Sequence, residues 1–272
     1  LAARKKKLRM TYSTLTYTTK EGIALITLNR PDQLNAVNSL MSKELPLAWQ
    51  EFNADDSAIV AILTGSGEKS FCTGADLADL PDMDGEAGLA TINSIKWTSL
   101  HNNIWKPVIC AVNGMCCGGG LHFVADSDIV IADEKATFFD THVKVGLVAG
   151  LEPVSLSKKI PLESVLRMSL VGGGERVTSD QALNIGLISE IVPSENLLKR
   201  AIEIANMIKV HSPSALSKTK KAIWNSKEQG LTASLDYAWN LISEQHQHPD
   251  FLEGTASFVE KRPPNWKPYS DN

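Results

Sequence analysis

The sequence predicts an α/β fold in which a core of strands and helices is followed by a helical region. Short apolar runs closed by turn residues alternate with helical stretches through the first two thirds of the chain. From about residue 195 the strand patterns stop, and only amphipathic helical stretches remain. Three consecutive glycines, residues 118–120, also stand where a strand gives way to a helix.

Four segments have the pattern of strands. Residues 22–30 alternate in polarity and then turn at Pro31, and residues 58–67 form a β-branched run that ends in glycines. Residues 107–114 and 127–133 are short apolar runs closed by turn residues, which is typical of strands buried on both faces.

Helical stretches lie between these strands and follow them, with apolar residues at the spacing of one helix face. They cover residues 38–52, 88–105, 120–128, 194–210, 214–230 and 233–247. A second glycine triplet reads as a polar turn before a helix that Thr178 or Ser179 would cap. We therefore divide the chain into a flexible tail (1–12), a core (13–194) and a C-terminal helical oligomerisation region (195–272).

The composition excludes several classes of protein. With 27 Lys and Arg against 31 Asp and Glu, a formal charge of −4 lacks the positive excess that nucleic-acid binding needs. The basic run at residues 4–9 reads as a solvated tail or an artificial extension, and Met10 as a candidate native start. No apolar run reaches membrane-spanning length and no signal-peptide core occurs, so we expect a cytoplasmic protein with no membrane partner.

The cysteines and histidines do not form a metal-binding pattern. Cys72, Cys110, Cys116 and Cys117 sit in apolar or glycine-rich contexts and read as reduced small hydrophobic residues. Neither CxxC nor HExxH occurs, so we expect no metal.

The glycine-rich turns also fail as nucleotide sites. The triplet lacks the third glycine of GxGxxG, because Phe123 stands there, and residues 65–70 lack the spacing of a phosphate-binding loop. Glycines before a helix start still allow close approach of a ligand to unpaired N–H groups. A second glycine-bearing turn, at residues 70–77, could aim another N–H at the same point. Two such donors on one carbonyl oxygen would stabilise an enolate or oxyanion.

Five segments in this order and spacing resemble the enoyl-CoA hydratase/isomerase (crotonase) superfamily. They are residues 26–38, 70–77, 106–120, 128–138 and 258–266, and the resemblance extends over about residues 13–266. It implies a spiral of ββα units with a C-terminal helical trimerisation region, assembled as trimers or dimers of trimers. It also implies an acyl-CoA thioester as ligand, with coenzyme A as part of the substrate and no separate cofactor.

The resemblance also implies site residues. The oxyanion hole would be formed by the peptide N–H groups of Ala75 and Gly119. Lys261 would approach coenzyme A from the C-terminal region, either its own or that of a neighbouring chain. The residues expected along the coenzyme A path are Leu34, Asn35, Ala36, Gly74, Asp76, Leu77 and Gly118.

Hydratases of this superfamily hold water between two glutamates, but here the matching positions are His122 and His142. The resemblance therefore indicates an atypical branch. Both residues could be ordinary core histidines. The chain has only six histidines, however, and two of them stand at the two positions where the family places its proton-transferring glutamates. His122, in the first turn of a helix, should be neutral and act as a base or hydrogen-bonding group, because that end of a helix disfavours a cation.

Nearby acidic residues could complete a catalytic group with His122 and His142. We expect Glu152 or Asp140 to assist the histidines, whereas Asp126 reads as part of a solvated helix face. A His142 oriented by either acid would resemble the histidine–acid pair of the branch that hydrolyses β-diketones.

Three functions follow: hydration or isomerisation of an enoyl-CoA, hydrolysis of a β-diketone C–C bond, and a non-catalytic acyl-CoA-binding subunit. The acidic segment 79–88 could be a lid over the acyl pocket or an exposed loop.

Overall fold

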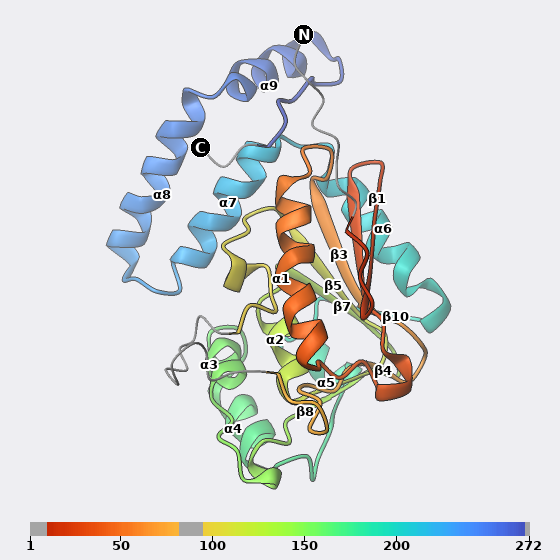
Figure 1. Cartoon of the computed structure of the whole chain (residues 1–272). Helices are drawn as coiled ribbons and strands as arrows, with labels where there is room; N and C mark the ends of the chain where they lie inside the picture. The colour runs from red at the N-terminus through yellow and green to blue at the C-terminus, as the bar shows by residue number, and fades with distance from the viewer. Residues whose placement is uncertain (1–9, 82–94, 270–272) are drawn as a thin grey trace, which may run out of the picture.

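The computed structural model describes residues 10–81 and 95–269, which build two sheets and their covering helices (Figure 1). In the described chain the larger sheet has six strands in the order β1-β2-β3-β5-β7-β10. Its neighbours are parallel except for β1 and β2, which pair antiparallel. The strands are β1 (Leu15–Lys20), β2 (Ile23–Leu28), β3 (Val60–Gly65), β5 (Val108–Val112), β7 (Ile129–Asp133) and β10 (Glu190–Val192).

The smaller sheet collects the short strands that directly follow β3, β5 and β7. These are β4 (Ser70–Cys72), β6 (Met115–Cys117) and β8 (Thr137–Phe139), joined at one edge by β9 (Val177–Thr178). After β6 the chain enters α2 (Leu121–Ala125), and after β8 it enters α3 (Leu151–Ser157). Each of these two units thus contains one strand of each sheet and then a helix, which confirms the expected α/β class with ββα units.

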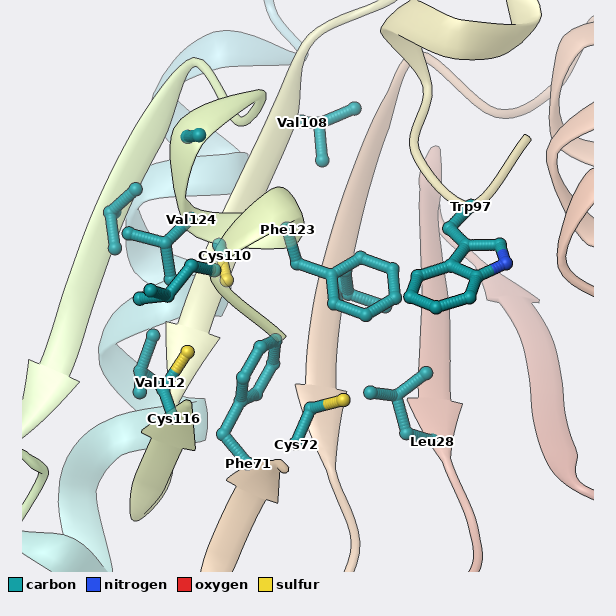
Figure 2. Close-up of a cluster of buried hydrophobic side chains, with 14 of the residues drawn as sticks. Leu28, Phe71, Cys72, Trp97, Val108, Cys110, Val112, Cys116, Phe123 and Val124 are labelled. Atoms are coloured by element: carbon teal, nitrogen blue, oxygen red, sulfur yellow. The ribbon is translucent and has the colours of Figure 1, made fainter. Parts of the chain in front are cut away.

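Both faces of the larger sheet are covered, which explains its continuous apolar strands. Alternate residues of β3, such as Ala61 and Leu63, pack with α1 (Ser39–Ala54) in the main core. Val60 and Ile62 point the other way and pack with α6 (Leu197–Ile208). Figure 2 shows the main core next to β5, with Phe123 of α2 lying between Phe71 and Trp97. The core therefore fixes α2 against both sheets.

Two helix starts follow the capping chemistry of the sequence. The side chain of Asn38 accepts a hydrogen bond from Met41 N at the start of α1. The side chain of Thr178 accepts from Gln181 N at the start of α5 (Ser179–Asn184), and Gln181 bonds back to Thr178 N in a capping box. Thr178 is thus the cap of the helix predicted after the second glycine triplet. α4 (Leu162–Leu170) lies between α3 and this turn.

The C-terminal helices extend away from the sheets as an arm (Figure 1). They are α7 (Pro213–Asn225), α8 (Leu231–His246) and α9 (Pro249–Glu260). Buried polar contacts hold α7 on the core: Lys220 Nζ lies 2.9 Å from Asp128 Oδ2, and Trp224 Nε1 donates to Asp128 Oδ1 at 2.7 Å. None of the described helices combines the length and apolar character needed to cross a lipid bilayer.

The helix predicted for residues 88–105 is wrong over its described part. Residues 95–105 contain only a short 3₁₀ turn, η4 (Leu100–Asn102). Side chains take the backbone groups that a helix would use, because Asn102 Nδ2 donates to the carbonyl oxygens of Lys96 and Thr98 at 2.8 Å. Residues 82–94, which include most of the predicted lid, lie outside the described residues. β1, the smaller sheet, α3, α4 and α9 had no separate prediction from pattern.

Candidate active site

A cavity of about 520 Å³ opens where the starts of α2 and α3 face the turn after β4. Its wall is mostly apolar, with two imidazoles and one carboxylate among its lining groups. The lining residues are Ala75, Leu77, Leu80, Pro81, Ile95, Trp97, Gly119, His122, His142, Leu147, Val148, Gly150, Leu151 and Glu152. A pocket of this size with a few convergent polar groups is typical of a small-molecule site.

The glycine triplet forms a 3₁₀ turn, η5 (Gly118–Gly120), that leads directly into α2. Gly118 has φ +52°, and the Cβ of any other residue there would meet His142 Cε1 at 3.8 Å. This turn brings Gly119 to the cavity wall and places His122 in the first turn of α2. The prediction of a glycine-led helix start carrying His122 is therefore confirmed.

Two backbone amides approach each other at this wall. A Cβ added at Gly74 would lie 2.6 Å from Gly119 N, and one added at Gly119 would lie 3.5 Å from Ala75 N. Ala75 forms a parallel bridge with Val37. In this bridge Val37 N donates to Gly74 O, and Asp76 N donates to Val37 O, so the N–H of Ala75 is not used. The amide of Ala75 therefore points away from Val37, and the amide of Gly119 belongs to the first turn of a helix, where N–H groups lack a helical partner.

His122 and Glu152 form a buried pair between α2 and α3. His122 Nε2 lies 3.1 Å from Glu152 Oε1, and the two side chains are 2% and 6% exposed. A carboxylate only accepts hydrogen bonds, so His122 donates from Nε2. Burial alone would raise the pKa of Glu152, but the hydrogen bond from His122 opposes it, and the pKa of Glu152 lies below its usual value. Glu152 is thus held as a carboxylate beside the cavity.

His142 is oriented by Asp140. Its Nδ1 lies 3.1 Å from both carboxylate oxygens, and its backbone N–H donates to Asp140 Oδ1 at 2.8 Å. Because Nδ1 donates to the carboxylate, the lone pair of the neutral ring is at Nε2, which lies 3.8 Å from Glu152 Oε1. The hydrogen bond to Asp140 raises the pKa of His142 despite partial burial. Asp140 and Glu152 therefore both lie beside the histidines.

The interpretation of Asp126 as part of a solvated helix face is wrong. Its side chain is buried, and it accepts a hydrogen bond from Thr98 Oγ1 at 2.8 Å. His101 Nε2, from η4, lies 3.3 Å from Asp126 Oδ2. The segment around η4 covers this face of α2, which a helix-periodicity argument for one helix does not reveal. His101 had no prediction at all.

His101, His122 and Asp126 also form a group whose potential metal-ligand atoms lie within 4.8 Å of one another. Two imidazoles and a carboxylate suit a first-row divalent ion. Asp126 already accepts a hydrogen bond from Thr98, however, and His122 already pairs with Glu152, whereas the His101 ring contacts Asp126. The expectation of no metal stays a prediction.

The segment expected along the coenzyme A path has several structural contacts. The Asn35 side chain is buried, accepts from Arg30 N at 3.0 Å and donates to the carbonyl oxygens of Ser66 and Ser70. Leu34 O accepts from Thr73 Oγ1, and Ala36 O accepts from Arg30 Nη1. Asn35 therefore ties the turn after β2 to the turn between β3 and β4.

Arg30 also pairs with Asp76, with 2.9 Å between Nη1 and Oδ2. This hydrogen bond, with those from backbone amides, lowers the pKa of Asp76. Leu77 is exposed and lines the cavity. Lys261 directly follows α9. Figure 1 shows α9 on the arm, away from α2 and α3.

Comparison with known proteins connects this geometry to one family. The family described as "Enoyl-CoA hydratase/isomerase" matches residues 18–269. The (E)-benzylidenesuccinyl-CoA hydratase of Thauera aromatica is 33% identical over 90% of this chain and 95% of its own. The short-chain-enoyl-CoA hydratase of Clostridium acetobutylicum is 33% identical over 89% of this chain and 94% of its own. A crystal structure of an enoyl-CoA hydratase/isomerase from Mycobacterium paratuberculosis is 41% identical, with a TM-score of 0.87 over 94% of this chain and 99% of that one.

Proposed function

Because this chain belongs to the enoyl-CoA hydratase/isomerase family, we propose that it adds water across the α,β double bond of an acyl-CoA, using Glu152 and His142. The chain has the crotonase-type fold and is an acyl-CoA-processing enzyme of the hydratase type. Each step of the addition can be assigned to residues of the cavity.

The thioester oxygen is held by the amide N–H groups of Ala75 and Gly119. The close approach of the Gly74 turn to Gly119 supports this role, because it brings the two segments within reach of one oxygen. As water attacks the β carbon, negative charge moves to the thioester oxygen, and fixed donors stabilise it there. Each such donor contributes about 3–4 kcal/mol to lowering the barrier in other enzymes.

The water is held between Glu152 and His142. The 3.8 Å between Glu152 Oε1 and His142 Nε2 is too long for a hydrogen bond, but one water about 2.8 Å from each atom bridges them. One hydrogen of this water is donated to the carboxylate of Glu152. The other is donated to the lone pair at His142 Nε2. This pair of one acid and one imidazole takes the place of the two glutamates that the family resemblance implies.

His142 then moves the proton. Its Nε2 takes a proton from the water as the hydroxyl oxygen bonds to the β carbon, and the resulting imidazolium returns that proton to the α carbon of the enolate. All atoms of the water thus enter the product. Asp140 stabilises the imidazolium, as its effect on the pKa of His142 indicates. His122 holds Glu152 ionised and in place through its Nε2–H.

The single observation that carries this proposal is the placement of Glu152. It lies 3.1 Å from His122 and 3.8 Å from His142, and it lines the same cavity as Ala75 and Gly119. A carboxylate at this point supplies the negative charge that two histidines alone would lack. Coenzyme A enters as part of the substrate, and no step needs a separate cofactor.

The test is product analysis with crotonyl-CoA. We expect loss of the enoyl thioester absorbance and a 3-hydroxyacyl-CoA by mass spectrometry, with activity lost in Glu152→Gln and His142→Asn. Incubation with a β-diketone and with a 3-enoyl-CoA separates hydration from C–C hydrolysis and from isomerisation. Cleavage of the β-diketone without hydration of any enoyl-CoA would contradict the proposal. Binding of acyl-CoA with no turnover would instead assign a non-catalytic role.

We also propose assembly as a trimer or dimer of trimers through the arm. Large apolar side chains of α8 and α9 are exposed in the single chain, among them Leu231, Trp239 and Phe258. A neighbouring chain would cover such a surface. Lys261 would then reach coenzyme A only in another subunit's site. Mass measurement in solution, with Trp239→Glu as the disruptive variant, tests this assembly.

A further inference from the structure

A third acid–imidazole pair, His101 with Asp126, lies beside His122 but does not line the cavity. His101 Nε2 lies 3.3 Å from Asp126 Oδ2, and the His101 and His122 rings meet edge to face, with centroids 5.3 Å apart at 75°. Asp126 directly follows α2 and stands four residues after His122, so its side chain lies on the same side of the helix as His122. Neither His101 nor Asp126 is among the described residues that line the cavity.

A second ring also contacts His122. The Trp97 and His122 rings meet edge to face, with centroids 5.8 Å apart at 83°. Trp97 is itself fixed, because its Nε1 donates to Ser42 Oγ at 2.8 Å and its carbonyl accepts from Trp49 Nε1 at 2.7 Å. Rotation of the His122 ring would therefore have to displace a fixed indole or the His101 ring.

His101 is fixed in turn by Asp126. A carboxylate only accepts hydrogen bonds, so Nε2 of His101 carries the hydrogen and Nδ1 is unprotonated. Burial lowers the pKa of His101, although Asp126 opposes this, so the ring is neutral at pH 7. Thr98 completes the arrangement, since its Oγ1 donates to Asp126 Oδ2 and accepts from His101 N at 3.3 Å.

The buried Nδ1 atoms of His101 and His122 have no hydrogen-bond partner among the described residues. A buried polar atom without a partner costs free energy, so something else must favour the orientation of each ring. Glu152 accepts from whichever nitrogen of the His122 ring faces it, so the orientation of that ring decides which nitrogen carries the proton. The same holds for the His101 ring and Asp126.

We propose that His101, held by Asp126, is a positioning residue that fixes the His122 ring so that its Nε2–H points at Glu152. The order of contacts is Asp126 to His101, His101 to His122, and His122 to Glu152. The kinetic effect of His101 rests on the proposed function, because His101 would affect the rate only through Glu152, the group proposed to bind water. The structural effect of His101, a single tautomer of His122, does not depend on any activity.

The structural test is the tautomer of His122, measured by NMR of protein labelled with ¹⁵N-histidine and treated with a chelator. Wild type is expected to show the Nε2–H form alone. His101→Ala and Asp126→Leu are expected to give a mixture of tautomers. His101→Phe, which keeps a ring but loses the contact with Asp126, is expected to show a larger share of the Nε2–H form than His101→Ala. Circular dichroism and thermal unfolding establish that each variant is folded.

The kinetic test uses the same variants with crotonyl-CoA. We expect kcat to fall about tenfold or more in His101→Ala, because small displacements of a catalytic group have large effects on rate. KM should stay within twofold, and the kcat of His101→Phe should lie between those of His101→Ala and wild type. The matched control is His248→Phe, which removes a histidine 3.8 Å from another buried aspartate, Asp250, on the arm. We expect it to leave both the His122 tautomer and kcat unchanged.

The two readouts separate this inference from the proposed function. If wild type hydrates no enoyl-CoA, the proposed function fails, but the tautomer test still decides the role of His101. A single His122 tautomer in both His101→Ala and Asp126→Leu overturns the inference. Stoichiometric, tight binding of Zn²⁺ that Asp126→Leu abolishes also overturns it, because the three residues would then be a metal site.

Discussion

Glu152, in the first turn of α3, accepts a hydrogen bond from His122, in the first turn of α2, with 3.1 Å between Oε1 and Nε2. The acid and the imidazole come from different ββα units, thirty residues apart in the chain. The contact puts a carboxylate beside the cavity in a chain whose positions for the family's two glutamates hold histidines.

Glu152→Gln should lower kcat by about a hundredfold or more, the usual range for loss of a group that acts on a proton or holds water. KM should change little, because shape and hydrogen-bond capacity are nearly kept. Steady-state hydration of crotonyl-CoA measures both. Glu163→Gln is the matched control, since Glu163 also lies in the first turn of a helix but is exposed. Equal activity of the two variants would show that Glu152 has no role in the reaction.

The kcat/KM profile should fall as pH decreases through a midpoint above 6.5. His142 must be neutral to take a proton from water, and Asp140 raises the pKa of His142 above the ordinary value of 6.5. Asp140→Asn should therefore move the midpoint to lower pH and reduce the plateau rate. An unchanged midpoint in Asp140→Asn, or a flat profile between pH 5 and 8, would speak against His142 as the base.

The raised pKa of His142 also makes the free energy of unfolding depend on pH. A histidine whose pKa is raised by folding stabilises the protein fully below its unfolded value of about 6.5, and this contribution is lost as pH rises through the folded value. The cost of His142→Asn in urea unfolding should thus be larger at pH 5.5 than at pH 8. The reverse order would mean that the Asp140 contact does not favour the protonated ring.

Gly74→Ala should reduce kcat by about 10²–10³-fold, as expected when an oxyanion donor is displaced. The added Cβ would lie 2.6 Å from Gly119 N, and Gly74 has φ +86°, which disfavours any side chain. Hydration rates and thermal unfolding of the variant separate lost catalysis from lost folding. The control is Gly230→Ala, because a Cβ at Gly230 meets nothing within 4 Å. Full activity in Gly74→Ala would remove the two amides from the mechanism.

Asn35→Ala should act on stability, whereas Leu34→Ala should act on substrate binding. Asn35 is buried and its side chain bonds to Arg30 N and to two carbonyl oxygens, so its loss leaves buried backbone groups unpaired at about 1–3 kcal/mol. Urea unfolding measures this free energy. KM for crotonyl-CoA, compared between the two variants, tests whether this segment lies along the coenzyme A path. No change of KM in Leu34→Ala would contradict that expectation.

The sequence by itself determined the α/β class, four strands of the larger sheet and the turns with strong local chemistry. The apolar runs of β3, β5 and β7 must be buried on both faces, and the glycines at 118–120 must form a tight turn before a helix, because few other residues allow it. The polar turn after the second glycine triplet predicted a helix cap at Thr178 or Ser179 for the same local reason, and the structure has it at Thr178. Order and spacing of five segments then indicated the family and drew attention to His122 and His142.

Only the tertiary structure decided which acid meets which imidazole. Asp140 could be matched to His142 two residues on, but Glu152 reaches His122 solely because α3 packs against α2. Asp126 and His101 are 25 residues apart, and the expected helix over 88–105 would have hidden their contact, since side-chain hydrogen bonds hold that segment as a turn. Distances between side chains on different elements depend on how the elements pack, and periodicity within one element carries no information about that packing.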